Sequence, residues 1–504
     1  MLGVILPGLA FALSYGQSPL YSSNQNSYFL HGLARAGVGL LRGDWLAKTV
    51  DPFPLFTRLV EVTTYLNERL FYVYQILLLG VYAYAIIGIA CVVTTVGHSV
   101  RTYLAFLAVF TAFHSALLTQ PTWYVMGIKP FAFLQLGLAG QYLLGSVLQP
   151  SVFGVFLLLS ILIFLRGRPV LAVLVGAIAP AVHATYLLSY VTVVAAYVSS
   201  SLGDGASRRG AARAALLGAV LTAAIAICSL LPFLPTTEAT YRRATHILVD
   251  FRLPQHARPS DWIGVGAYLQ VAIVVTAAWT MRRSKLFGVL AVPAVVGGVL
   301  TLVAVFTQSQ ALALSFPWRV SAFLMPLSSS VLAAHLVSDL AGRILHRVRF
   351  AEAAWLPLAI AALAAVSISG VWLSMEQRAR VAQAVDASLT RYVGDMSQAG
   401  DLFLVPPSME DFRLAAGVPV LVDWKSHPFK DIEVVEWHDR LQAAESFYQA
   451  PVGESRCRLL RSLDARYGLT HLVDARESPT PCPGLRAVYR DSAWTVYQWA
   501  AGAI

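Results

Sequence analysis

Charged residues are scarce in this chain. Only 13% of its 504 residues are charged, whereas soluble globular domains carry about 25%. Hydrophobic residues make up 57% of the chain, and the mean hydropathy is +0.63. This composition excludes an ordinary soluble globular protein. Several catalytic motifs are also missing, since the sequence has no glycine-rich phosphate loop, no serine nucleophile elbow and no paired-cysteine motif.

Cysteine is also rare, with four residues in the whole chain. Cys91 and Cys228 lie within apolar segments, whereas Cys457 and Cys482 lie in the more polar C-terminal part. The second pair could form a disulfide if that part faces an oxidising compartment, and the sequence leaves this pairing open.

Long apolar runs recur from residue 1 to about residue 374 and then stop. Runs of this length can cross a hydrocarbon core of about 30 Å, and they predict an all-α polytopic membrane domain with about eleven transmembrane helices. We place this domain at residues 1–375 and a small extracytoplasmic α/β domain at residues 376–504. The stretch Met1–Leu13 lacks the basic start of a signal peptide, so we interpret it as the first helix.

The basic residues indicate the orientation in the membrane. The net charge of +10 would suggest a nucleic-acid partner in a soluble protein, but here short loops carry the arginines, so we predict none. Such loops face the cytoplasm, which places the N-terminus inside and the C-terminal domain outside. The loops in question contain Arg101; Arg166 and Arg168; Arg208, Arg209 and Arg213; Arg282, Arg283 and Lys285; Arg343, Arg347 and Arg349.

Two apolar stretches are harder to assign. Residues 169–199 could form one tilted helix or two short ones, and we predict two that turn between Pro180 and His183, because one helix would hold an imidazole near the bilayer midplane. Residues 131–148 predict a helix that lies in the membrane interface or dips into it. In the C-terminal domain we expect strands at 401–405 and 418–422, a helix at 409–416 and a hairpin over 487–499 around Asp491.

The first outer loop, residues 21–69, contains two candidate catalytic acids, Asp44 and Asp51, and a candidate substrate-binding residue, His31. A carboxylate beside an apolar membrane surface is partly desolvated, which raises its pKa and suits it to act as a general base. Alternatively, Asp44 caps a helix and Asp51 forms a turn before Pro52.

The outer loop at residues 234–261 is dense in cationic side chains, including the candidate substrate-binding residues Arg252 and His256. Arg319 begins a span from the outer side, and His183 lies at the tip of its helix pair. Arginine forks suit a phosphate leaving group, so these residues could bind a phosphate. Contacts with lipid headgroups, or with acids of the C-terminal domain, would explain the arginines equally well.

A metal site is a further option. His31, Asp44, Asp51, His183 and His256 could supply ligands, but their spacing matches no ligand motif. We therefore predict no cofactor and no metal ligands, although a divalent metal could still take part.

The arrangement resembles the GT-C superfamily of polytopic membrane glycosyltransferases. The resemblance lies in the long first outer loop with Asp44 and Asp51, the helix pair that turns at His183-Ala184-Thr185-Tyr186, the Arg/His-rich outer loop, and the outer α/β domain with its strand-like stretch at 467–473. It implies transfer of a sugar from a polyprenyl-phosphate or polyprenyl-diphosphate donor to a glycan, lipid or protein acceptor on the extracytoplasmic side of a bacterial inner membrane.

In the superfamily, an acid of the first outer loop is the catalytic base, and many members place it directly after the first helix. Here Asn24-Gln25-Asn26 occupy that place, so the resemblance moves the role to Asp44 or Asp51. The alternatives to a transferase are a transporter or flippase for a lipid-linked saccharide, a glycan polymerase, and a non-catalytic envelope assembly protein. No clear internal repeat supports a transporter, and eleven spans exceed what an anchor needs.

Overall fold

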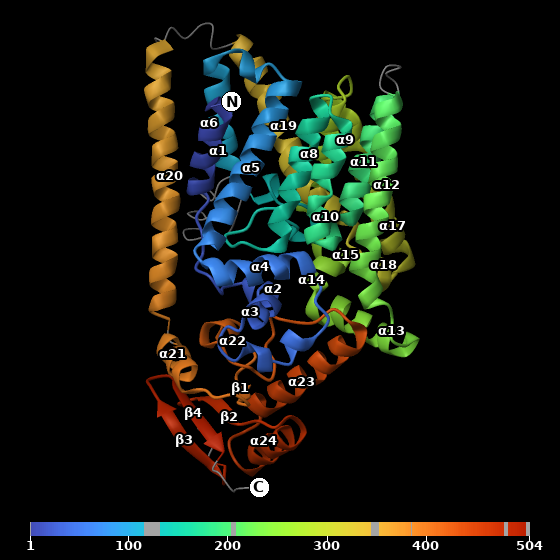
Figure 1. The fold of residues 1–504 in the computed structure, drawn as a ribbon. Helices are drawn as coiled ribbons and strands as arrows, with labels where there is room; N and C mark the ends of the chain where they lie inside the picture. The colour runs from blue at the N-terminus through green and yellow to red at the C-terminus, as the bar shows by residue number, and fades with distance from the viewer. Residues whose placement is uncertain are drawn as a thin grey trace. The chain divides into compact units, whose positions relative to one another are not determined.

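The structure is a computed structural model that describes residues 2–114, 132–202, 208–343, 352–384, 386–477 and 482–499. Most of these residues are helical, and a small sheet lies near the C-terminus (Figure 1). A mainly helical fold followed by a small region with a sheet agrees with the prediction. The chain divides into two compact units, each built from three stretches of sequence.

Unit 1 comprises Met1–Gln17, Phe71–Leu231 and Leu248–Ser374. Within it α8 packs on α9, α11 packs on α12 and α17, and α16 packs on α19. Its described helices are α1 (Leu2–Ser14), α5 (Leu70–Val93), α6 (Val100–His114), α8 (Val155–Leu165), α9 (Pro169–Gly176), α10 (Ile178–Val182), α11 (Leu187–Leu202), α12 (Arg208–Leu230), α14 (Pro254–Ala257), α15 (Pro259–Trp262), α16 (Val265–Thr280), α17 (Leu286–Thr307), α18 (Gln310–Leu314), α19 (Ser321–Arg343) and α20 (Glu352–Ala382), the last of which continues past Ser374.

The expected number of eleven membrane-length helices is not shown. Among the described residues, five helical segments are long and apolar enough to cross a membrane: Leu70–Val93, Arg208–Phe233, Leu286–Thr307, Gln310–Leu340 and Ile360–Ala382. Other apolar helices have only 10–17 residues. Two of these, Pro150–Leu165 and Pro169–Val182, begin at a proline, which shortens them, and a third ends at His114, where the described residues stop. At 1.5 Å per residue, such helices fall short of the hydrocarbon thickness unless they are extended at their ends.

The surface of the long helices is apolar. Leu216 and Ile227 of α12 are 69% and 62% exposed, and Phe306 of α17 is 82% exposed. A continuous apolar surface of this kind is unfavourable in water and suits contact with lipid tails. These helices therefore indicate a membrane protein.

The predicted break at His183 is present. Helix α9 ends at Gly176 and α10 ends at Val182, His183 has an extended backbone (φ −140°, ψ 99°), and α11 begins at Leu187. The extended residue after α10 ends helical hydrogen bonding there, so the apolar run does not form a single helix.

The helix predicted at 131–148 is wrong over its described part. From residue 132 the chain forms the short 3-10 turns η4 (Ala132–Leu134) and η5 (Leu138–Gly140), followed by irregular backbone and then η6 (Pro150–Gly154). Ala139 (φ 54°) and Gly140 (φ 64°) both adopt the left-handed conformation, which ends helical hydrogen bonding at this point.

Polar side chains from three helices satisfy the backbone of this irregular segment. Such partners are required because a non-helical backbone in an apolar environment would otherwise leave its N–H and C=O groups unpaired. The bonds run from Gln75 Nε2 to Gly145 O at 2.6 Å, from Gln270 Nε2 to Leu136 O at 2.6 Å, from Ser329 Oγ to Leu134 O at 2.7 Å, and from Leu138 N to Ser321 Oγ at 2.7 Å.

Unit 2 comprises Ser18–Leu70, Pro232–Ile247 and Met375–Ile504. The first outer loop and the C-terminal part of the chain thus belong to one compact unit. Its described elements are α2 (Gln25–Tyr28), α3 (Leu30–Ala36), α4 (Pro54–Leu66), α13 (Glu238–His246), α21 (Ala387–Met396), β1 (Phe403–Leu404), α22 (Phe412–Ala416), α23 (Asp431–Gln449), α24 (Glu454–Tyr467), β2 (His471–Ala475), β3 (Leu485–Arg490) and β4 (Trp494–Trp499).

The sheet of unit 2 has the order β1-β2-β4-β3. Strand β1 runs parallel to β2, and β4 pairs antiparallel with both β2 and β3. The predicted hairpin is present, because Asp491 Oδ1 accepts hydrogen bonds from the N–H groups of Ala493 and Trp494 and so closes the turn. Of the strand predicted at 418–422, only a single bridge from Val420 to Phe403 forms.

The core of this region lies between the sheet and helices α21 and α22. Phe403 and Val473 of the sheet are buried together with Val393 of α21 and Phe412 of α22. The sheet therefore supplies a base on which α22 and the segment that follows it are held.

Cys457 and Cys482 form a disulfide, with a Cα–Cα distance of 5.4 Å. The bridge ties α24 to the segment before β3. The other two cysteines, Cys91 and Cys228, are free.

Replacing Cys457 and Cys482 by serine should lower the unfolding free energy of unit 2 by about 3 kcal/mol, because the bridge closes a loop with a sequence separation of 25. The measurement is thermal unfolding of the purified protein, followed by protease resistance of its C-terminal part. A variant with Cys91 and Cys228 replaced serves as the control and should unfold like the unmodified chain. Reaction of both Cys457 and Cys482 with maleimide in unreduced protein would contradict the pairing.

Candidate functional site

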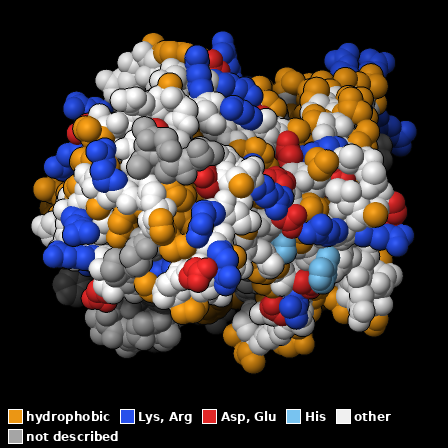
Figure 2. Space-filling model, turned by 90° about the horizontal axis from the view of Figure 1, so that it is seen from below, with side chains coloured by type: hydrophobic (Ala, Val, Ile, Leu, Met, Phe, Trp, Pro, Cys, Tyr) orange, Lys and Arg blue, Asp and Glu red, His pale blue; other side chains and the backbone are white. Residues whose placement is uncertain are grey.

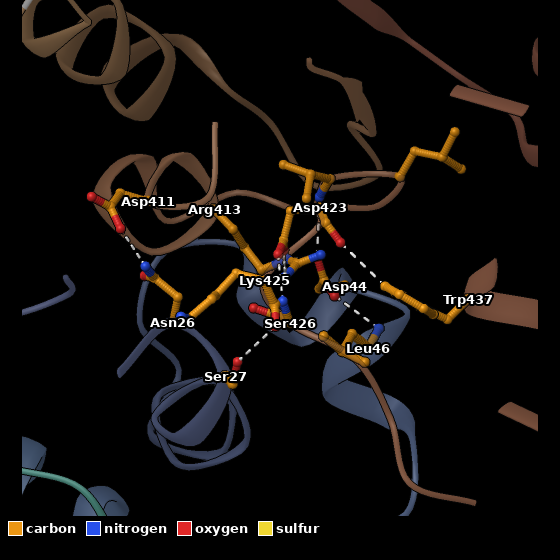
Figure 3. A network of polar contacts seen from close by, with 12 residues as sticks. Asn26, Ser27, Asp44, Leu46, Asp411, Arg413, Asp423, Lys425, Ser426 and Trp437 are labelled. Atoms are coloured by element: carbon orange, nitrogen blue, oxygen red, sulfur yellow. Dashed lines mark hydrogen bonds and ion pairs between the residues drawn. The ribbon is translucent and has the colours of Figure 1, made fainter. Parts of the chain in front are cut away.

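Asp44 is fully buried in unit 2. It follows the 3-10 turn η1 (Leu41–Gly43), and its side chain is 0% exposed. Oδ1 accepts a hydrogen bond from the N–H of Leu46 at 2.8 Å, and Oδ2 accepts one from the N–H of Val420 at 3.1 Å. Nε of Arg413 donates to the same Oδ2 at 2.9 Å (Figure 3). Both carboxylate oxygens are therefore bonded within the protein.

Arg413 joins Asp44 to a second buried acid. It lies in α22 and is 3% exposed, and its Nη1 donates to Oδ2 of Asp423, which is 1% exposed. Oδ1 of Asp423 accepts from the N–H of Ser426 at 2.6 Å (Figure 3). We call these three side chains the Asp44–Arg413–Asp423 network. It brings two negative charges and one positive charge into the interior, and backbone N–H groups bond the remaining carboxylate oxygens.

Burial and charge act in opposite directions in this network. Burial raises the pKa of Asp423, and the guanidinium of Arg413 acts against this shift. For Arg413, burial acts to lower the pKa, but Asp423 and Asp44 together hold the pKa above its ordinary value. The network is therefore stable only with all its members in place.

The backbone also joins the loop and the C-terminal part beside this network. The N–H of Leu40 donates to the carbonyl of Gly417 at 2.7 Å. A Cβ at Gly39 would lie only 2.4 Å from that oxygen, so only glycine fits there. Gly417 itself has φ 67° and ends α22.

Side chains near the start of the loop also bond the C-terminal part. Nδ2 of Asn26 donates to Oδ1 of Asp411, and Oγ of Ser27 donates to the carbonyl of Lys425 at 3.3 Å (Figure 3). Asp411 is exposed at the surface, and partial burial of its carboxyl raises its pKa, while the bond from Asn26 acts against this. Sequence reasoning missed Asp411, because an acid in the first turn of a predicted helix, here 409–416, is typical of an ordinary helix start.

Asp51 is more accessible than Asp44. Its side chain is 10% exposed, and Oδ2 accepts a hydrogen bond at 2.9 Å from Nη2 of Arg35, whose own side chain is 48% exposed. Oδ1 accepts from the N–H of Phe53 and from Oγ1 of Thr57, both at 2.9 Å. These last two bonds support the start of α4. The carboxylate of Asp51 thus has a structural contact through Oδ1 and an ion pair at the surface through Oδ2.

His31 lies close to these acids. It is 8% exposed, and its Nε2 lies 3.2 Å from the carbonyl of Thr49. Burial lowers the pKa of His31, while Asp51 and Asp44 act to raise it. Unit 2 thus brings together three of the residues singled out in the sequence.

The other four candidates belong to unit 1. Arg319, in the 3-10 turn η11 (Pro317–Val320), donates from Nη1 to Oε1 of Gln141 at 2.7 Å. Its guanidinium also lies over the ring of Tyr186, 4.8 Å from the centroid. Nδ1 of His256 lies 2.8 Å from the carbonyl of Ala139 and 3.5 Å from Nε2 of Gln141. Gln141 therefore connects Arg319 with His256.

His183 is next to this group. Nδ1 of the imidazole lies 2.9 Å from Oγ1 of Thr185, and the ring makes an edge contact with Tyr186 at 5.7 Å between centroids. These contacts join His183, His256 and Arg319 through Gln141 and Tyr186. Arg252 is not among the residues that they join, and it is buried in the π-helical turn η10 (Ile247–Arg252).

Gln141 was missed from the sequence, although it carried a signal. It is a buried polar side chain within a largely apolar stretch, and such residues often have a specific partner in membrane proteins. The wrong prediction of a helix at 131–148 gave no reason to expect a partner for Gln141, because its side chain would have had a different direction in a helix.

Metal ligands do not gather in the part of the chain that the structure describes. No group of three or more His, Cys, Asp or Glu side chains there is arranged to hold a metal ion. The sequence-based statement that no metal ligands are predicted, with a divalent metal as an option, therefore stays a prediction.

One comparison with known proteins finds a match. A family described as a domain of unknown function, DUF6798, matches residues 387–444, which contain α21, β1, α22 and most of α23. The match includes Arg413 and Asp423 and assigns no activity. No curated protein matches the chain.

Replacing Asp44 by alanine should destabilise unit 2 by about 3–5 kcal/mol, because Arg413 loses a buried partner and two backbone N–H groups lose their acceptor. The change can be followed by thermal unfolding and by protease resistance of the C-terminal part. Asp51→Ala is the matched control in the same loop. We expect it to cost about 1–2 kcal/mol, since the ion pair that it removes is partly exposed and contributes little, which leaves the two bonds at the start of α4 as the main loss. Equal, small effects of the two substitutions would contradict a structural role for the buried network.

Proposed function

We propose that this chain is a membrane glycosyltransferase of the GT-C type. It moves a sugar from a polyprenyl-phosphate or polyprenyl-diphosphate donor to an acceptor on the extracytoplasmic side. One observation carries the proposal: the first outer loop and the C-terminal part form one compact unit, joined through Asp44 and Arg413. A long first outer loop and an outer domain are two of the features on which the resemblance rests, and the contact between them supports the proposal.

The composition of unit 2 constrains the topology. Its three stretches fold together, so they must lie in the same aqueous compartment, and the chain between them must cross the membrane an even number of times. Between the first two stretches the described segments are α5, α6, α8, the pair α9 and α10, α11, and α12; between the last two they are α16, α17, α19 and α20. If each forms one crossing, these even sets and α1 together give the eleven spans expected from the sequence.

The compartment itself is proposed from two features. The loops rich in arginine and poor in acid, such as the one with Arg282 and Arg283, favour the cytoplasm. The bridge between Cys457 and Cys482 suits an oxidising space outside the cytoplasm. Together they favour an N-terminus inside and a C-terminal domain outside, as in a bacterial inner-membrane enzyme.

This topology can be tested by labelling single cysteines, in a chain whose two free cysteines are replaced, with a membrane-impermeant maleimide. Arg58→Cys, Glu238→Cys and Met396→Cys, one in each stretch of unit 2, should all react in intact cells, because the side chains at these positions are exposed. Arg282→Cys should react only after permeabilisation. Labelling of the three positions from opposite sides would rule out the topology.

The reaction needs a base that an acceptor can reach. In the proposed step, the acceptor oxygen attacks the anomeric carbon, the bond from that carbon to the lipid phosphate breaks, and the phosphate leaves with the electron pair. The proton of the acceptor hydroxyl passes to a carboxylate. Asp44 has no exposed surface, whereas Oδ2 of Asp51 accepts a hydrogen bond from one side chain among the described residues, that of Arg35, which is half in solvent. We therefore assign the base to Asp51 and a positioning role to Asp44.

Unit 1 contains, by itself, a group of residues suited to a phosphate. Arg319 is held by Gln141 and stacked on Tyr186, which fixes its guanidinium as a fork donor. An arginine held in this way suits the neutralisation of a phosphate leaving group. His183 and His256 belong to the same group and add hydrogen-bonding side chains to it.

The decisive measurement is transfer of labelled sugar from a polyprenyl-phosphate donor by the purified protein in lipid. Asp51→Asn should reduce the rate at least about 100-fold, because general-base catalysis contributes on this scale. Thermal unfolding should show that the variant stays folded.

Asp411→Asn is the matched control, since Asp411 is an exposed acid of the same unit. Transfer by Asp51→Asn at the unmodified rate, with loss in Asp411→Asn, would move the base to Asp411. If unmodified protein fails to transfer sugar from every polyprenyl-linked donor tried, the proposed function is wrong.

A further inference from the structure

Unit 2 contains a cavity of about 460 Å³ that none of the proposed catalytic groups occupies. Its wall comes from the loop between Gly39 and Lys48 and from the C-terminal part, at Gly400–Leu402, Pro419, Arg440 and Tyr467. All these residues belong to the same compact unit. A volume of this size falls within the range of small-ligand sites and suits one or two sugar rings.

The charge in the cavity is mainly positive. Lys48 is exposed, and the described residues offer it no carboxylate at ion-pair distance. Arg42 donates from Nε and Nη2 to the carbonyls of Ala34 and Arg35, at 3.1 and 3.0 Å, so it is oriented by neutral groups. Asp401 is the acid in the wall, and it lies 3.6 Å from His471. The positive charges of Lys48 and Arg42 are thus left for an anion.

A third cation is held rigidly in the wall. The guanidinium of Arg440 lies between two aromatic rings, 4.2 Å from the centroid of Trp45 and 4.7 Å from that of Tyr467. Its Nε donates to Glu436 at 2.8 Å. The two rings and the guanidinium form a pre-ordered surface, which lowers the entropic cost of binding.

The rest of the wall suits hydroxyl groups. Four of the lining residues are glycines, which bring no side chain into the cavity, so a ligand can approach the backbone at these positions. Lys and Arg side chains are also spread over the face seen from below in Figure 2, with acidic and apolar side chains between them. A cavity with cations, aromatic rings and exposed backbone matches a polar ligand that carries a negative charge.

We propose that this cavity binds an acidic saccharide, a sugar that carries a carboxylate or a phosphate. The anionic group contacts Lys48 and Arg42, and the hydroxyls bond the glycine backbone. The inference deepens the proposed function and rests on it in one respect: within that function, the ligand is part of the acceptor glycan. Binding itself requires no transfer chemistry.

Equilibrium binding to the full chain in lipid nanodiscs tests the site, with the fluorescence of Trp45 and its neighbours or calorimetry as the readout. The probes are digalacturonic acid, glucose 6-phosphate, an uncharged galactose disaccharide and inorganic phosphate. At least one acidic sugar should bind about tenfold more tightly than the uncharged disaccharide and inorganic phosphate, because a charge-assisted contact adds to the sugar contacts. Preference for the galacturonate or for the phosphate ester identifies the anionic group.

Substitutions place the ligand in the cavity. Lys48→Glu should weaken binding of the preferred acidic sugar at least about tenfold, and Lys48→Arg should keep it within about threefold. Arg458→Glu is the matched control, because it makes the same change of charge at an exposed position of α24 outside the cavity. It should leave the affinity unchanged.

Three results would overturn the proposal: both acidic sugars binding no more tightly than the uncharged disaccharide, inorganic phosphate binding as tightly as the preferred acidic sugar, or full affinity in Lys48→Glu. Binding by the unmodified chain in the absence of any polyprenyl-linked donor separates this proposal from the catalytic one. The acidic sugar should bind whether or not the unmodified chain transfers sugar.

Discussion

The arrangement of unit 2 depends on one buried set of charges, Asp44, Arg413 and Asp423. Removing a carboxylate or a guanidinium from water costs several kcal/mol, and the cost is met only when the partners meet in the right geometry. Asp44 and Arg413 are 369 residues apart in sequence, so they can meet only when the loop and the C-terminal part are fully folded together. The network therefore favours one register between these segments, and a displaced register leaves charges buried and unpaired.

Other features of unit 2 follow from this register. Gly43 and Pro419 each precede a residue that bonds within the network, and both line the cavity beside Lys48. The shape of that cavity is therefore set by the same contacts that hold the loop. The requirement that the first loop and the C-terminal part share one compartment has the same origin, because a salt bridge between Asp44 and Arg413 cannot form across a bilayer.

The sequence predicted local structure well where a local cause dominates. The break at His183 lies at an extended residue, and the hairpin at Asp491 follows from an aspartate that bonds the backbone two and three residues later. It could not predict that Asp44 would be buried, since burial depends on a partner hundreds of residues away. The same limit applies to Arg413, which looks like any surface arginine of a short helix until Asp44 and Asp423 surround it.

The failure at residues 132–148 has a different cause and indicates where unit 1 has a use for polar groups. An apolar stretch predicts a helix because a helix satisfies its own backbone, yet here Gln75, Gln270 and two serines take over that task. These polar side chains lie on α5, α16 and α19, inside an apolar bundle. A helix would satisfy the backbone of the segment without them. What the irregular path achieves is the placement of Gln141 against Arg319 and His256. Because the fold gives up helical hydrogen bonds to orient one arginine, we propose Arg319, rather than the more numerous exposed arginines, as the residue that binds a phosphate.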